Sequence, residues 1–390
     1  MWHAGKIKKL SVPYYGLQTV DFLGGNGAQG YGDYFDWVVA QEPNARQLLS
    51  PPPGVEMNFE NAVEVAWESR LPAELHKTAW AVECVENFLK NRSDAQQPFF
   101  LWLSIPDPHP PYTAPAPWSR MYDPSQMPLP NRREGELDLL PPHYKILFEQ
   151  GLKTAGRIAP TNVPLEQHRK VLAMAYGMAG KFDDMVGKVL RLLEQHNLLD
   201  DTVVCFTSDH GQMMGDHWMY SMPPCHLDGA IRVPSIWRYP KSFSKGVVSH
   251  AMASHLDLAP TILELAGIPI PEGNVPPAPE AEQQRPAWPG KSLAPILTGK
   301  SSSIQDSIVV EFDSDYTGLR LRTFIDRRYC ITMYVNQPYG ELFDLDQDPR
   351  QLYNLWDDPN YESVKKDLLI RLLHRLAETD STLPRRLGHA

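Results

Sequence analysis

Apolar residues along the first two hundred positions alternate between helical spacing and short continuous runs. Helical spacing covers residues 74–91 and residues 165–195, with a glycine-containing break predicted near residues 177–180. Each helical pattern is followed by an apolar run, at residues 99–105 and 202–207, which predicts a strand buried on both faces. A helix, a turn, a buried strand and then a polar cluster are typical of βαβ units. We therefore predict an α/β fold with a mostly parallel central sheet flanked by helices.

The pattern changes after about residue 300. A helix is predicted at residues 361–373, and three shorter runs before it resemble antiparallel strands. These runs are residues 307–312, 320–324 and 329–335. We place a domain boundary here, with an α/β domain at residues 1–300 and a small C-terminal α+β domain at residues 301–390.

Composition and charge exclude several classes of protein. The 390 residues carry 37 basic and 47 acidic side chains, so the formal charge is 37 − 47 = −10, and nucleic-acid binding is not expected. No run of 18 apolar residues occurs, so no membrane span is predicted. The four cysteines are far apart and form no C-x-x-C pair, which argues against a disulfide framework. The start lacks an apolar signal core, which favours a cytoplasmic location only if Met1 is the true start. The sequence gives no indication of the oligomeric state.

The strongest candidate for chemistry is the cluster Ser208-Asp209-His210-Gly211, which follows the second apolar run. Ligands of α/β folds collect at the carboxyl ends of strands. A carboxylate and a neutral imidazole are common metal ligands, so Asp209 and His210 are candidates for a metal site. The alternative is that Asp209 caps the following segment and His210 is an ordinary loop residue.

A second candidate is His109, which lies in Pro106-Asp107-Pro108-His109-Pro110-Pro111 at the end of the first apolar run. The prolines restrict the backbone, and the ordinary pKa of histidine suits a general acid. A plain surface turn is the alternative. We interpret His217 and His226 as structural loop residues, and the pair Asp183-Asp184 as a solvated helix face.

Taken together, these stretches resemble the sulfatase family within the alkaline-phosphatase-like superfamily, in particular its arylsulfatases and phosphonate monoester hydrolases. The matching phrases extend over nearly the whole chain and occur in the family's order. They are residues 1–5, 99–112, 181–187, 200–211, 229–234, 255–261 and 340–345.

The resemblance implies an alkaline-phosphatase-like fold and the hydrolysis of sulfate esters assisted by a divalent cation. Calcium is the expected cation, with Mn²⁺ or Mg²⁺ as alternatives. Asp209 and His210 match two metal ligands of the family. His109 matches the histidine that contacts the sulfate and helps the alcohol leave. His3 matches the histidine that helps to eliminate sulfate afterwards.

Several family features have no counterpart in this chain. The family converts a cysteine in a C-x-P-S-R phrase to formylglycine, its nucleophile, and none of the four cysteines lies in such a phrase. The family's first strand, with its paired Asp ligands, is also missing. The lysine of the family's Lys-Trp-His phrase falls at Met1, and a substrate-binding lysine falls at Met222. These differences predict that the chain is the carboxyl-terminal part of a sulfatase with a misassigned or truncated start.

Three functions follow from the sequence. The first is a sulfatase, incomplete in this chain, acting on a small sulfate ester or a sulfated sugar. The second is a phosphonate monoester or phosphodiester hydrolase of the same fold, because His210 stands where many sulfatases have Asn. The third is an anion-binding protein without catalytic activity.

Overall fold

The computed structural model describes residues 9–25, 30–55, 65–92, 97–150, 163–270, 289–315 and 317–379, and the backbone alone of 152–154 and 157–159. The chain divides into two compact units, which are described separately. Unit 1 comprises residues 1–130, 147–202 and 218–221, and unit 2 comprises residues 131–146, 203–217 and 222–390. The predicted domain boundary near residue 300 falls inside unit 2 and stays a prediction.

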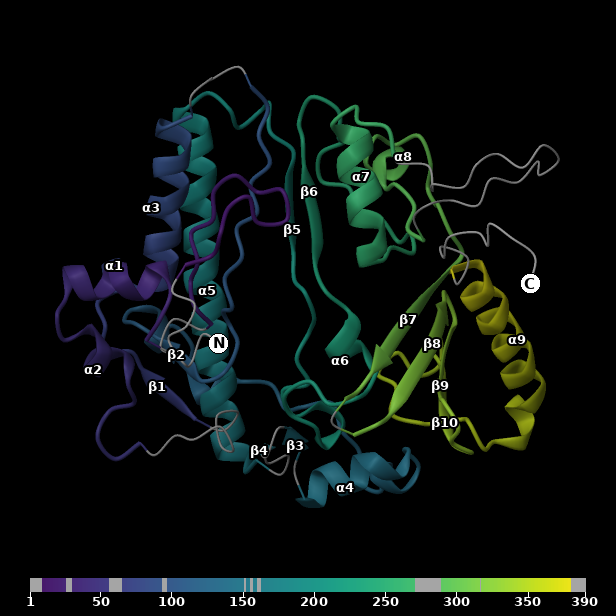
Figure 1. Ribbon diagram of the computed structural model, residues 1–390. Coiled ribbons are helices and arrows are strands. Elements are labelled where there is room, and N and C mark those ends of the chain that lie inside the picture. Colours follow the sequence, from purple (N-terminus) through teal and green to yellow (C-terminus); the bar gives the residue numbers. More distant parts are fainter. Residues whose placement is uncertain are drawn as a thin grey trace, which may run out of the picture. The chain divides into compact units, whose positions relative to one another are not determined.

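Unit 1 is built around two contacting helices, α3 (Lys77–Lys90) and α5 (Leu165–Gln195), which lie side by side in Figure 1. Strands β1 (Ala66–Glu68) and β2 (Tyr112–Ala114) pair in parallel, and α5 contacts both of them. The remaining regular elements are α1 (Asp33–Gln41), α2 (Ala45–Leu49), β3 (Leu152–Thr154), β4 (Arg157–Ala159) and the 3-10 turns Ala73–Leu75, Trp118–Arg120 and Pro124–Gln126.

The predicted helix at residues 165–195 is confirmed, but the predicted break near residues 177–180 is wrong. Helix α5 runs without interruption for 31 residues. A Cβ atom added at Gly177 would lie 2.3 Å from the backbone oxygen of Trp118. The glycine therefore lets a neighbouring loop approach the helix closely and does not end it.

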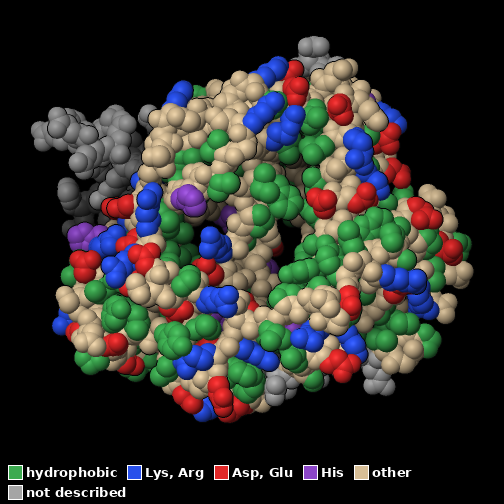
Figure 2. All heavy atoms as spheres, turned by 180° about the vertical axis from the view of Figure 1, so that it is seen from behind, with side chains coloured by type: hydrophobic (Ala, Val, Ile, Leu, Met, Phe, Trp, Pro, Cys, Tyr) green, Lys and Arg blue, Asp and Glu red, His purple; other side chains and the backbone are tan. Residues whose placement is uncertain are grey.

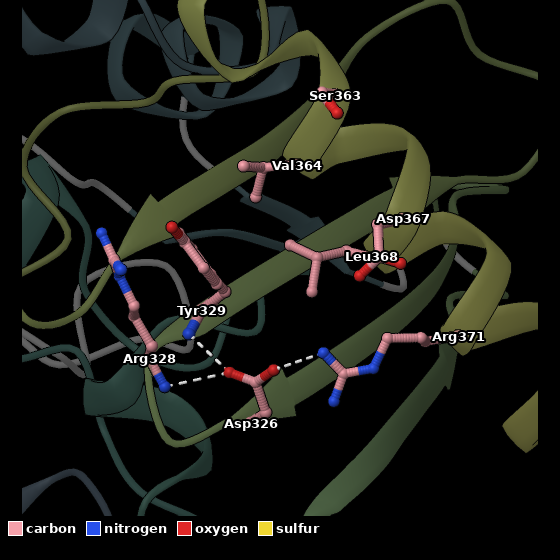
Figure 3. A pocket seen from close by; sticks show the side chains of 8 residues that line it. All are labelled: Asp326, Arg328, Tyr329, Ser363, Val364, Asp367, Leu368 and Arg371. Atoms are coloured by element: carbon pink, nitrogen blue, oxygen red, sulfur yellow. Dashed lines mark hydrogen bonds and ion pairs between the residues drawn. The ribbon is translucent and has the colours of Figure 1, made fainter.

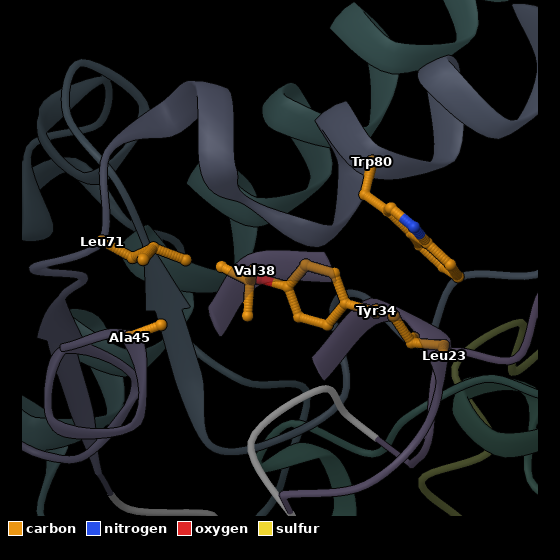
Figure 4. Packing of buried hydrophobic residues seen from close by; sticks show 6 residues of the cluster. All are labelled: Leu23, Tyr34, Val38, Ala45, Leu71 and Trp80. Carbon is orange, nitrogen blue, oxygen red and sulfur yellow. The ribbon is translucent and has the colours of Figure 1, made fainter. Parts of the chain in front are cut away.

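The core of unit 1 packs α1 against α3. Figure 4 shows six of its buried side chains: Leu23, Tyr34, Val38, Ala45, Leu71 and Trp80. The rings of Tyr34 and Trp80 are 5.6 Å apart between centroids, and the Tyr34 hydroxyl donates a hydrogen bond of 3.0 Å to the carbonyl of Leu75. These contacts hold α1 against α3 and against the 3-10 turn that precedes α3.

The predicted buried strand at residues 99–105 is not present. The segment belongs to no strand. Residues 98–105 form no backbone hydrogen bond with any residue that the structure describes. Phe100 and Trp102 are 56% and 73% exposed, while Phe99 packs on Phe88 with ring centroids 5.6 Å apart. Without a neighbouring strand, an apolar run has no partner for its backbone and only one face to bury. Figure 2 shows that apolar side chains reach the surface among charged ones on the face drawn.

Unit 2 contains a four-stranded antiparallel sheet in the order β10-β9-β8-β7, with helix α9 (Glu362–Thr379) packed against it (Figure 1). The strands are β7 (Ser307–Asp313), β8 (Arg320–Asp326), β9 (Tyr329–Tyr334) and β10 (Gly340–Asp344). Their core residues are Phe324, Ile331, Leu342, Leu368 and Leu372. The three predicted C-terminal strands and the helix after them are confirmed, and the helix extends past the predicted end.

A second, smaller sheet of unit 2 pairs β5 (Val204–Thr207) with β6 (Ser235–Arg238) in antiparallel fashion. The remaining described helices of this unit are α6 (Asp228–Ile231), α7 (Leu258–Leu265), α8 (Ala294–Leu297) and the 3-10 turns Glu136–Asp138, His255–Asp257 and Pro359–Tyr361. The 3-10 turn Asp216–Trp218 begins in unit 2 and ends in unit 1. Helix α4 (Pro142–Gln150) contains the chain position at which unit 2 gives way to unit 1.

The fold is α/β, but the mostly parallel central sheet is not seen in the described part of the chain. There, β1 and β2 form the one parallel pair, and the run at 202–207 yields an antiparallel, half-buried strand. Within the described ranges, no helix has an apolar stretch long enough to cross a membrane.

Candidate functional site

The loop after β5 is held in place by a close contact between two backbone segments. The amide of Gly211 donates a hydrogen bond of 2.8 Å to the carbonyl of Ala230, in α6. A Cβ atom at position 211 would lie 2.2 Å from the carbonyl oxygen of Gly229, so a larger residue would push the loop away. The loop thereby presents Asp209 and His210 directly beyond the end of the strand.

The side chains of Asp209 and His210 face each other. The Nδ1 atom of His210 lies 2.8 Å from the carbonyl of Gly211, which only accepts, so Nδ1 carries the proton and Nε2 is left with its lone pair. Nε2 lies 3.6 Å from Oδ2 of Asp209. Two ligands at about 2.0–2.6 Å from one cation lie roughly 3–3.6 Å apart, so this spacing suits a shared divalent ion.

The electrostatics of Asp209 favour its ionised form. Partial burial opposes ionisation, but the positive charge that His210 carries when its ring is protonated, and hydrogen bonds such as that from its backbone amide, hold the pKa of the Asp209 carboxyl below its usual range. An ionised carboxylate is the form that binds a cation.

The pair makes only part of a metal site. The side chains of Asp209 and His210 are 85% and 40% exposed. Among the described residues, no group of three or more His, Cys, Asp or Glu side chains could hold a metal ion. The donor set therefore fits a divalent cation at an open edge, with an affinity lower than that of a complete site.

His109 belongs to unit 1, and its ring is oriented by its own turn. Its amide donates a hydrogen bond of 2.7 Å to the carbonyl of Pro106, and Nδ1 donates one of 2.5 Å to the carbonyl of Pro110. His109 is exposed, so Nε2 is the ring atom available to a ligand. An imidazole fixed in this way can hold or give a proton at one defined atom.

The other predicted positions are more scattered. Met222 is half-buried in unit 2, where it offers a thioether in place of the expected ammonium group. His3 lies outside the described residues. Asp209, His210 and Met222 share one unit, whereas His109 lies in the other.

The structural interpretation of His217, His226 and the aspartate pair is confirmed. His217 is buried with Nδ1 against Glu136, and His226 is hydrogen bonded to Thr323 at 2.7 Å. Asp184 forms an ion pair of 2.8 Å with Lys188, one turn along α5.

One buried group was missed by the sequence analysis. Lys77, at the first position of α3, forms an ion pair with Asp107, and both side chains are buried. A lysine in the first turn of a helix is disfavoured by the helix dipole, and this local oddity could have drawn attention to it.

A pocket of about 450 Å³ in unit 2, drawn in Figure 3, carries no comparable chemistry. Asp326 accepts hydrogen bonds from the amides of Arg328 and Tyr329 and from the guanidinium of Arg371. The carboxylate of Asp326 therefore connects the turn between β8 and β9 to α9 through these hydrogen bonds.

Comparison with known proteins gives these residues a context. Residues 4–268, more than half of the chain, match the family described as Sulfatase. The chain belongs to the sulfatase family. Residues 215–378 of this sulfatase-family chain also match the C-terminal part of N-sulphoglucosamine sulphohydrolase.

The similar proteins include both an arylsulfatase and a phosphonate monoester hydrolase. The multifunctional alkaline phosphatase superfamily protein PehA of Trinickia caryophylli is 29% identical over 90% of this sulfatase-family chain and 69% of its own length. An arylsulfatase of Clostridium perfringens is 27% identical over 87% of this chain and 65% of its own. The phosphonate monoester hydrolase of Silicibacter pomeroyi superposes with a TM-score of 0.68 at 27% identity, covering 85% of this chain and 68% of that one. The chain spans about two thirds of the length of each of these relatives.

Proposed function

We propose that this chain takes part in metal-assisted hydrolysis of sulfate esters and supplies two metal ligands and a leaving-group acid. The spacing of His210 Nε2 and Asp209 Oδ2, 3.6 Å at the end of β5, carries the proposal. Membership of the sulfatase family and the resemblance to an arylsulfatase support it.

The cation would be held by Asp209 and His210, and Ca²⁺ is the ion that we expect, ahead of Mn²⁺ and Mg²⁺. A divalent ion would polarise the oxygens of the sulfate group. Because the two side chains are exposed, this chain alone should bind the ion weakly.

His109 would act on the alcohol half of the ester. When a nucleophile, to which no residue of this chain is assigned, bonds to sulfur, the S–O bond to the alcohol would break, its electron pair would go to the alcohol oxygen, and that oxygen would take the proton from Nε2 of the protonated ring. Nδ1 keeps its own proton on the carbonyl of Pro110, so the ring stays oriented throughout. His3 is proposed for the later release of sulfate. The alcohol half is a small molecule or a sulfated sugar.

The proposal assigns no nucleophile to this chain, since its sequence has no C-x-P-S-R phrase for formylglycine. At position 222 a methionine stands where a sulfate-binding lysine is expected, so sulfate should be held less firmly there. Met222→Lys is the variant that tests this difference, and we expect it to tighten sulfate binding.

Calcium binding to the chain as it stands tests the metal ligands. In isothermal titration at low ionic strength we expect one weak site, which Asp209→Ala and His210→Ala each abolish. Asp183→Ala, which removes an exposed carboxylate from α5, is the matched control and should leave binding unchanged. Equal binding by wild type and Asp209→Ala would overturn the assignment.

Turnover is tested by extending the reading frame upstream of the Met1 codon. If it encodes a C-x-P-S-R phrase, the longer protein should hydrolyse an aryl sulfate, and His109→Ala should slow poor leaving groups more than good ones. Absence of both the phrase and any turnover, with sulfate binding retained, would favour the anion-binding alternative.

Phosphonate monoester or phosphodiester hydrolysis is the second candidate. It is favoured by His210 and by the 27% identity to a phosphonate monoester hydrolase. Direct competition between an aryl sulfate and an aryl phosphonate in the longer protein decides between the two substrates.

A further inference from the structure

The turn that carries His109 begins with a deeply buried carboxylate. The side chain of Asp107 is 1% exposed, and that of Lys77, its ion-pair partner, is 7% exposed. Neither carboxylate oxygen of Asp107 has a hydrogen-bond partner among the described residues, so the contact with Lys77 is its main compensation. A buried charge without its partner is costly. The local structure is therefore stabilised in the conformation that keeps Asp107 next to Lys77.

The surroundings of the pair are also buried. Lys181 of α5 lies 4.0 Å above the ring of Trp118 and donates a hydrogen bond of 3.4 Å to the carbonyl of Ala73. Burial and the charges of the two lysines hold the pKa of His76 well below its usual value, so His76 stays neutral. Water is thus largely kept away from the point at which Asp107 is attached to α3.

The turn itself contains few other anchors. Its backbone closes through the hydrogen bond from the amide of His109 to the carbonyl of Pro106, at 2.7 Å. The segment before it, residues 98–105, forms no backbone hydrogen bond among the described residues. The prolines on either side of His109 limit rotation, and because proline has no backbone N–H they donate no hydrogen bond that would attach the turn. The pair with Lys77 is therefore what ties the start of the turn to a helix.

We propose that Lys77 is a positioning residue that acts through Asp107 to hold the turn in which His109 keeps Nδ1–H on Pro110 and presents Nε2. The inference deepens the proposed function, on which it rests for the role of Nε2. It assigns the buried pair a purpose other than stability, because the pair fixes which ring nitrogen of His109 carries the proton.

The experiment observes the ring of His109 without requiring turnover. Nitrogen-15 NMR of the full chain with labelled histidine reports the tautomer of each neutral ring, and the His109 signals are assigned by their loss in His109→Ala. In the wild type, Nδ1–H should be the main tautomer, although Nε2–H is the commoner one in a free histidine side chain.

The decisive variant removes both charges together, as Lys77→Met with Asp107→Asn. Neither charge is then left buried alone, so the protein should fold, which thermal unfolding verifies. We expect the main tautomer of His109 to change from Nδ1–H to Nε2–H. Glu86→Gln with Lys90→Met removes an exposed ion pair from the same helix and should leave the tautomer unchanged.

Two outcomes are distinguishable. If the double variant folds and His109 keeps Nδ1–H as its main tautomer, the positioning role of Lys77 is refuted. If the tautomer changes but the longer protein hydrolyses aryl sulfates of every leaving group at the wild-type rate, the positioning role stands and the leaving-group role of His109 fails.

Discussion

The C-terminal sheet of unit 2 and the segment 98–109 of unit 1 are both apolar in sequence, but they are held by different means. In the sheet, β7 to β10 pair with their chain neighbours, and α9 covers a continuous core. The segment 98–109 has no strand partner among the described residues and is attached at its two ends, by Phe99 on Phe88 and by Asp107 on Lys77. Stability is therefore spread over many contacts in the first region and concentrated in very few in the second.

The largest expected effect is that of Lys77→Met alone. It leaves the carboxylate of Asp107 buried without a partner, which typically costs about 3–5 kcal/mol. Lys90→Met, which breaks an exposed pair on the same helix, should cost no more than about 0.5 kcal/mol. Urea unfolding of both variants measures the difference, and similar losses would show that the buried pair is not the anchor.

Leu342→Ala tests the sheet. This side chain is fully buried in the core between the strands and α9, so its truncation should cost about 2–5 kcal/mol. The same urea experiment reads the loss. A cost below about 1 kcal/mol would mean that the sheet is less tightly packed than its burial indicates.

Acid should weaken unit 2 through two buried histidines, His143 and His226. Burial lowers the pKa of His143 to about 4, and burial together with the nearby charge of Arg322 lowers the pKa of His226 to about 4. Since the unfolded chain takes up these protons near pH 6.5, stability is fully present above that pH and is lost as the pH falls toward 4. Each histidine should remove roughly 2 kcal/mol between pH 7 and pH 5.

His226→Gln checks this pH dependence. The loss of stability between pH 7 and pH 5 should shrink by roughly 2 kcal/mol in this variant. His250→Gln, at an exposed position of the same unit, should keep the wild-type slope. Equal slopes in both variants would remove His226 as a cause.

The smallest effect is expected for Trp102→Ala. The ring is 73% exposed, so its removal should change the free energy of unfolding by no more than about 0.5 kcal/mol, despite its size. A loss comparable to that of Leu342→Ala would show that residues 98–105 are covered in solution, and the contrast between the two regions would disappear.

Much of the candidate site was predictable from the sequence. The cluster at 208–211 follows a strand as expected, and His109 lies in the turn that its prolines indicate. The orientation of the imidazoles was not predictable, because it depends on the carbonyls of Gly211 and Pro110. The pair of Lys77 and Asp107 was also missed, since its members are 30 positions apart and neither belongs to a periodic pattern.

The sequence by itself determined the elements whose signals are local. Helix α5 and the strands β7 to β9 lie where periodicity placed them, because each is specified by its own residues and its chain neighbours. The tertiary structure alone decided that residues 99–105 form no strand and that β5 pairs antiparallel with β6. An apolar run becomes a buried strand only when distant partners cover it. It also decided that α5 passes through Gly177 unbroken, since the loop that packs there comes from far away in the chain.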